Sequence, residues 1–299
     1  MRLRQIEVFH AVYSRGSVTK AAEVLNVSQP SVSKVLAHAE QQLGYSLFDR
    51  ESGKLVPTPE AHQLFAHVAT VYDSVDRLRN VADNLRTAET GRVRIAATPA
   101  FGIDLLPWSV ATYREKHSDT TFAVETLHHN EICSALLESR LDIGLGFDPV
   151  VMPGIAEETL AHGSLYVLTP PDVDLGAKDV VTLNDLADLP FIKLDNRGPL
   201  GRLLSTHIES SGVQLNTVAY VETYHVAKAL VSYGAGITIT DEVTAKSDGH
   251  ANIKVRPLEP DIGFRISALR SDNVPLSIVS QQFLAHLSTS IREFLEKPV

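Results

Sequence analysis

A run of small polar and basic residues lies between positions 28 and 34 of this 299-residue sequence. Ser28 and Gln29 precede Pro30, and Ser33 and Lys34 follow shortly after it. Hydroxyl and amide groups can read the edges of base pairs, and a lysine ammonium can pair with a phosphate. If this run opens a helix, its exposed end carries groups that suit the major groove of DNA.

The flanking residues predict the helices that must position this run. Apolar residues recur at helical spacing over 3–15 and again from Val18 to Leu25, with Gly16 as the stop between the two helices. Asn26, which tolerates a left-handed backbone, should end the second helix. We expect Ser28 to cap a third helix with Pro30 in its first turn and a buried stripe that ends at Leu43.

Two short strands should follow the third helix and form a wing. Residues 45–48 and 54–56 can pair around the segment 49–53, where Gly53 supplies the turn. Residues 1–56 hold seven Lys and Arg against five Asp and Glu, which is a weak excess of positive charge. Spacing and charge alone therefore also fit a small helical bundle that binds no DNA.

A long helix is predicted next, over residues 59–90. Thr58, Pro59 and Glu60 provide an N-cap, a proline suited to the first turn and an acidic first turn. An apolar stripe in alternating three- and four-residue steps is typical of a helix that packs on a partner helix. Its members are Ala61, Leu64, Val68, Val71, Val75, Leu78, Ala82 and Leu85. We expect Leu64, Val68, Val71, Val75, Leu78 and Leu85 to mediate dimerisation; packing on the C-terminal part of the same chain is the alternative.

From Gly91 onward, strand-like and helix-like segments alternate, which predicts an α/β fold. The expected strands are 93–97, 121–127, 143–147, 165–168, 191–193, 218–222, 237–240 and 264–269. The expected helices are 108–116, 132–139, 200–211 and 224–233, and residues 274–295 should form a closing helix or a pair of helices. Their order implies two lobes joined by crossing strands. We expect lobe I to comprise 91–163 and 267–299, and lobe II to comprise 164–266.

Ligands of open α/β sheets bind beyond the carboxyl ends of strands, next to helix N-termini. The turns in such positions contain Thr98, Pro99, Ala100 and Phe101, then Phe147 and Asp148, then Asn196, and finally Thr223 and Tyr224. These are the candidate effector-binding residues. Asp148 could pair with an ammonium or guanidinium group of a ligand, although a solvated aspartate at a strand end is the alternative.

The segment 21–34, together with Leu43-Gly44, Leu47-Phe48, Arg50 and Pro57-Thr58, resembles the DNA-binding domain of LysR-type transcriptional regulators. The C-terminal part is similar to that family's effector domain, which has the two-lobed fold of periplasmic solute-binding proteins. The resemblance implies an α/β multidomain protein: a winged helix-turn-helix over 1–58, a linker and dimerisation helix over 59–90, and the two lobes. The DNA-binding residues that follow from the resemblance and the helix pattern are Ser28, Gln29, Pro30, Ser33, Lys34, Arg50 and Lys54.

The same resemblance implies the partners. A LysR-type regulator binds double-stranded promoter DNA as a homodimer or homotetramer and responds to a small-molecule effector held between its lobes. The stretch 94–100 with 105–107 looks most like members that sense amino acids or opine-type derivatives. Pro99 stands where family members often have a hydroxyl residue, and it offers no amide hydrogen to an effector carboxylate.

Other function classes find little support in the sequence. Two Ser-x-x-Lys matches, at 17–20 and 31–34, fall on the short predicted helices, and no nucleophile elbow or phosphate-binding loop is present, so we expect no enzyme and no cofactor. His129 and Cys133 could share a helix face, but no further cluster completes a metal site. The chain shows no signal-peptide pattern and no apolar run of membrane-spanning length, which predicts a cytoplasmic protein. A free-standing solute-binding module remains the alternative.

Overall fold

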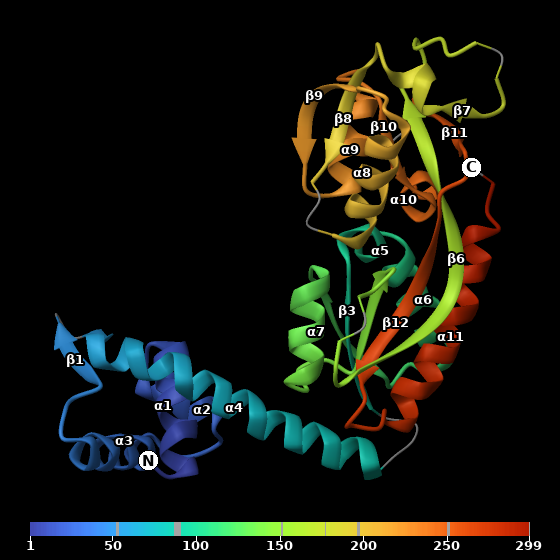
Figure 1. The fold of residues 1–299 in the computed structure, drawn as a ribbon. Coiled ribbons are helices and arrows are strands. Elements are labelled where there is room, and N and C mark those ends of the chain that lie inside the picture. The colour runs from blue at the N-terminus through green and yellow to red at the C-terminus, as the bar shows by residue number, and fades with distance from the viewer. Residues whose placement is uncertain are drawn as a thin grey trace. The chain divides into compact units, whose positions relative to one another are not determined.

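The computed structural model describes residues 1–51, 54–86, 91–150, 152–176, 178–195, 198–249 and 252–298. These residues divide into two compact units, Met1–Ala82 and Asp83–Val299. Figure 1 shows the first unit as helices with a small hairpin, and the second as two lobes built on mixed α/β structure. None of the helices described here is long and apolar enough to cross a membrane.

The first unit opens with α1 (Leu3–Arg15), α2 (Val18–Val24) and α3 (Gln29–Leu43). Gly16 and Asn26 have φ values of 61° and 51°, so each supplies the left-handed residue that the sequence predicts after its helix. Pro30 lies in the first turn of α3, as expected. The helices pack around a buried core that contains Phe9, Val12, Ala21, Val32 and Leu36.

Ser28 occupies the N-cap position of α3, as expected, but its side chain makes no capping hydrogen bond. The backbone N–H of Ser31 already donates to the carbonyl oxygen of Ser28, at 3.0 Å. The hydroxyls of Ser28 and Ser31 bond to each other instead, at 2.8 Å. Both hydroxyls therefore remain at the exposed N-terminal end of the helix.

The wing consists of β1 (Phe48–Glu51) and β2 (Lys54–Pro57), which pair antiparallel. The first strand begins at Phe48, so the expectation of a strand over 45–48 is wrong. Glu40 explains the difference, because its Oε1 accepts hydrogen bonds from the N–H groups of Leu47 and Phe48, at 2.8 and 3.3 Å. The chain before Phe48 is thereby tied to α3 rather than to a neighbouring strand.

The long helix α4 covers Pro59–Arg86, and its start is capped by Thr58, whose Oγ1 accepts from the N–H of Ala61 at 3.2 Å. The beginning of its apolar stripe packs into the core of the first unit, where Ala61 and Val68 are buried. Farther along, Val71 is 43% exposed and Leu78 is 70% exposed. The stripe therefore has an inner end inside this unit and an outer end that presents apolar surface to solvent.

Lobe I is a sheet with the order β4-β3-β5-β12-β6, in which β3, β4 and β5 are parallel and β12 runs antiparallel to β5. Its elements are β3 (Arg92–Ala97), α5 (Pro99–Gly102), α6 (Leu105–Lys116), β4 (Thr121–Thr126), α7 (His129–Leu137), β5 (Ile143–Phe147), β12 (Gly263–Ser271) and α11 (Ile278–Leu295). The C-terminal segment forms this one helix, α11, which packs on α6.

Lobe II contains the parallel pair β8 and β9 and a sheet in which β10 and β11 flank β6. Its elements are β7 (Val181–Thr182), the 3₁₀ helix η1 (Leu183–Leu186), β8 (Pro190–Leu194), α8 (Pro199–Ser211), β9 (Asn216–Val221), α9 (Tyr224–Ser232), β10 (Thr238–Asp241), α10 (Glu242–Lys246) and β11 (Lys254–Glu259). The sequence pattern predicts neither β7 nor β11.

The strand β6 (Ile155–Thr169) joins the lobes. It pairs with β12 from Ile155 to Ser164, and from Leu165 onward its neighbours are β10 and β11. The predicted strand covered only 165–168. The missed half carries charged and small residues, including Glu157 and Glu158, which hide the apolar alternation of a strand. The return crossing lies at β12, which pairs with β6 from Gly263 onward.

Candidate functional site

The first candidate surface is the exposed N-terminal end of α3. Ser28, Gln29, Pro30 and Lys34 are exposed there, and Ser33 is half-buried. The side chain of Gln29 donates to the Ser33 hydroxyl across 3.0 Å. This bond holds an amide and a hydroxyl together on one face, in the arrangement that a recognition helix uses to meet base edges.

The wing carries the other two predicted DNA-binding residues. Arg50 lies on β1 opposite Leu55, and Lys54 lies on β2 opposite Glu51. Their positions on a two-stranded hairpin suit contacts to the DNA backbone beside the groove. Their side chains lie outside the described part of the chain, so the backbone register is what positions them here.

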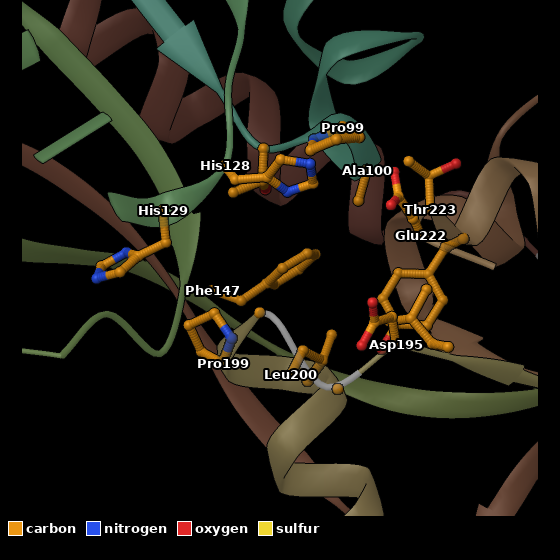
Figure 2. Close-up of a pocket in the computed structure, with 15 residues that line it drawn as sticks. Pro99, Ala100, His128, His129, Phe147, Asp195, Pro199, Leu200, Glu222 and Thr223 are labelled. Carbon is orange, nitrogen blue, oxygen red and sulfur yellow. The ribbon is translucent and has the colours of Figure 1, made fainter. Parts of the chain in front are cut away.

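The second candidate site is a pocket between the two lobes, with a volume of about 70 Å³ (Figure 2). Lobe I contributes the strand ends after β3 and β5 and the start of α7, and lobe II contributes the turns after β8 and β9. Of the predicted effector-binding residues, those that line it are Thr98, Pro99, Ala100, Phe147, Thr223 and Tyr224.

The other predicted effector-binding residues are placed differently. Phe101 is fully buried, with its ring centre 4.3 Å from that of Phe147, so it supports the wall from behind. Asp148 pairs with the chain's own Arg265, whose Nε lies 3.1 Å from Oδ1. Its expected role as the partner of a ligand ammonium is therefore wrong, because a guanidinium of the protein already occupies that carboxylate. Asn196 lies outside the described residues.

Several lining residues are not predicted from the sequence, namely His128, His129, Leu194, Asp195, Pro199, Leu200, Gly201 and Glu222. Asp195 directly follows β8, and Glu222 directly follows β9. The strand-end rule selects Asn196 after the predicted strand 191–193 and Thr223 after 218–222, so it misses each carboxylate by one residue. The sequence gives a weaker indication that the start of α7 lines the pocket, because this depends on how the helix packs beside the sheet.

The pocket combines groups that favour an anion with groups that favour a cation. Among the described elements, the N-terminal ends of α7, α8 and α9 contribute lining residues, and helix N-termini favour anions. The Oγ1 of Thr98 and the hydroxyl of Tyr224 are buried, and neither has a hydrogen-bond partner among the described residues. Burial, reinforced by the nearby Asp241 carboxylate, raises the pKa of Tyr224 well above its usual value, so its hydroxyl stays protonated. Asp195 and Glu222 supply carboxylates on the lobe II side.

His129 and Cys133 lie one turn apart on α7, with Nε2 and Sγ 3.7 Å apart. In Figure 2 the His129 ring points away from the centre of the pocket, whereas that of His128 lies beside Pro99. Burial, followed by the positive charge of Arg202, lowers the pKa of His129, and burial raises that of Cys133. No cluster of three or more potential metal-ligating side chains occurs within the described ranges.

A polar contact joins the lobes directly beside the pocket. The Nε2 of His225, in the first turn of α9, lies 3.3 Å from the carbonyl oxygen of Ala100 in α5. Ala100 lines the pocket, and His225 adjoins the lining residue Tyr224. A ligand that shifts either wall would therefore act on this interlobe contact.

Comparison with known proteins matches two family models to nearly the whole chain. A model described as the bacterial regulatory helix-turn-helix protein of the lysR family matches residues 3–62, and one described as the LysR substrate binding domain matches residues 86–292. A Pseudoalteromonas protein, the HTH-type transcriptional regulator DgcR, is 40% identical over 97% of this chain and 100% of its own length. The octopine catabolism/uptake operon regulatory protein OccR of Rhizobium meliloti is 28% identical over 97% of this chain and 96% of its own. Full-length CbnR, in a crystal structure with its target DNA, aligns with a TM-score of 0.72 at 20% identity, over 97% of this chain and 100% of that one.

Proposed function

The chain belongs to the LysR family of transcriptional regulators, and from this premise we propose how its residues perform the regulation. Copies of α3 in an oligomer bind spaced half-sites of an operator, with Gln29, Ser33 and Lys34 at the base edges and phosphates. An amino-acid-like effector binds between the lobes of the second unit. Binding shifts the equilibrium between two subunit arrangements, because the effector has a higher affinity for one of them.

The observation that carries the effector class is the division of charge preference around the pocket. The N-termini of α7, α8 and α9 and the unpartnered hydroxyl of Thr98 suit a carboxylate. Asp195 and Glu222, at the ends of β8 and β9, suit an ammonium group. A ligand with both groups a few ångströms apart is a zwitterionic amino acid or a close derivative. The relative named for octopine, itself an amino-acid derivative, supports the same class.

The test is a calorimetric titration of the full chain with a panel of amino acids and their analogues. We expect at least one amino acid to bind, and the matching amine without the carboxylate and acid without the amine to bind at least about tenfold more weakly. Equal binding of the deaminated acid would contradict the ammonium site and reduce the proposal to a carboxylate effector.

The substitution Glu222→Gln sharpens this test. We expect about a 10- to 100-fold loss of affinity for the amino acid, because a hydrogen bond to a charged group contributes more than one between neutral groups. The deaminated acid should lose little, since it makes no contact with that carboxylate. Glu209→Gln, on the exposed surface of α8, is the matched control and should bind both ligands as the unmodified protein does.

A further inference from the structure

We propose that the DNA-facing surface continues from α3 onto the first residues of the chain, where Arg2 and Arg4 bind phosphates of the DNA backbone. The proposal rests on the proposed function, since it takes the exposed face of α3 as the face that meets DNA. It adds a phosphate-binding element at the start of α1.

The exposed stripe of α3 leads toward the amino terminus. Pro30, Lys34 and His38 are spaced four residues apart, so they share one helix face, and all three are exposed. The Nδ1 of His38 lies 3.0 Å from the side-chain Nε2 of Gln5 in α1. Figure 1 accordingly draws the amino terminus beside α3. The stripe that begins with the predicted DNA-contacting residues thus ends at the start of α1.

Gln5 fixes this junction because it is buried and bonded at both ends of its amide. Its side chain is 4% exposed, and its Oε1 accepts from the backbone N–H of Arg2 at 2.6 Å. Its Nε2, which can only donate, therefore faces His38, so the Nδ1 of His38 accepts. The neutral His38 ring then carries its proton on Nε2, where an exposed N–H can be donated to a phosphate.

The side chains at this junction suit an anionic partner. Arg2 is exposed at the start of α1. Arg4 is 46% exposed and bonds the Glu7 carboxylate across 3.1 Å, a surface ion pair that contributes little and can be exchanged for a phosphate. Together with Lys34, these two arginines concentrate positive charge on one face of the first unit. Duplex DNA, with its regular phosphates, is the partner that such a face fits.

The experiment measures how DNA affinity depends on salt for the full chain and for Arg2→Ala, Arg4→Ala and the double variant. Each lost phosphate contact should reduce the slope of log K against log salt concentration by about 0.9 per bound subunit. Affinity should fall several-fold at physiological salt for each substitution. The same slope change should appear on operator and on scrambled duplex, because phosphates carry no sequence information.

Arg15→Ala is the matched control, since it removes one exposed arginine from the other end of α1, roughly 20 Å away. Its slope should equal that of the unmodified protein. Unchanged slopes in the Arg2 and Arg4 variants, or an equal change in Arg15→Ala, would overturn the proposal. If the unmodified protein fails to distinguish operator from scrambled DNA, the proposed function fails, whereas the slopes on scrambled duplex still decide the role of the arginines.

Discussion

Replacing Lys228 by methionine is expected to lower the free energy of unfolding of the C-terminal unit by about 3–5 kcal/mol. The side chain is 3% exposed, and its ammonium donates to the carbonyl oxygens of Thr244, Ala245 and Ser247 at 2.9, 3.2 and 2.6 Å. Methionine fills a similar volume but cannot donate. The substitution therefore leaves three buried carbonyl groups without this donor.

The place of Lys228 in the fold explains why this loss matters for function. Its three carbonyl partners lie at the C-terminal end of α10 and just after it, where the helix dipole favours a cation. Burial lowers the pKa of Lys228, and the carboxylates of Asp104, Asp241 and Asp248 counteract that effect. The ammonium thus ties α10 to α9 within lobe II, and both of these helices pack against α5 of lobe I.

Urea denaturation of the full-length variant, followed by a probe of the C-terminal unit, measures the effect. Lys116→Met is the control, because Lys116 is exposed at the end of α6 and should change stability by less than about 0.5 kcal/mol. A Lys228→Met variant as stable as this control would show that water or a rearranged α10 replaces the ammonium.

The substitution Leu78→Asp in α4 is expected to dissociate the oligomer and weaken operator binding by about 10²- to 10⁴-fold. Leu78 is 70% exposed in the isolated chain, yet it continues the stripe whose earlier members, Ala61 and Val68, are buried. A carboxylate buried against the same helix of a second chain would have no partner in an apolar seam. Two half-sites bound by separate monomers lose the effective concentration that a dimer provides.

Sedimentation velocity and operator titration, performed on the same samples, test this prediction. Thr70→Asp adds the same charge at an exposed position outside the stripe, and it should leave both the oligomer and the affinity unchanged. An intact oligomer in Leu78→Asp would contradict α4 pairing and favour association through other surfaces of the chain.

Signals from neighbouring residues in the sequence are sufficient to predict most of the helices and strands. The left-handed stops at Gly16 and Asn26 and the cap at Thr58 depend on neighbouring residues only, so they are readable from the sequence. The start of β1 depends on Glu40, which lies on α3 and reaches across to two backbone N–H groups. The first half of β6 depends on β12, about a hundred residues away. Contacts of this kind leave no periodic trace.

The pocket residues likewise divide into those that the sequence predicts and those that depend on distant contacts. Thr98 and Tyr224 follow strands, and that rule alone predicts that they face a common edge. Asp148 follows a strand too, but the sequence does not reveal that Arg265 of β12 pairs with it. Asp195 and Glu222 each lie one residue before the position that the same rule selects, because β8 ends at Leu194 and β9 at Val221. The position of a strand end is thus predictable, whereas the partner of a charged side chain there depends on the tertiary structure.

The most direct test of the account is a titration of the full chain on an operator selected from random duplexes, compared with a scrambled duplex at physiological salt. A regulator that reads base edges through Gln29 and Ser33 should prefer the operator by at least about 10³-fold. Equal affinity for both duplexes would contradict the central claim, because binding would then rest on phosphates alone.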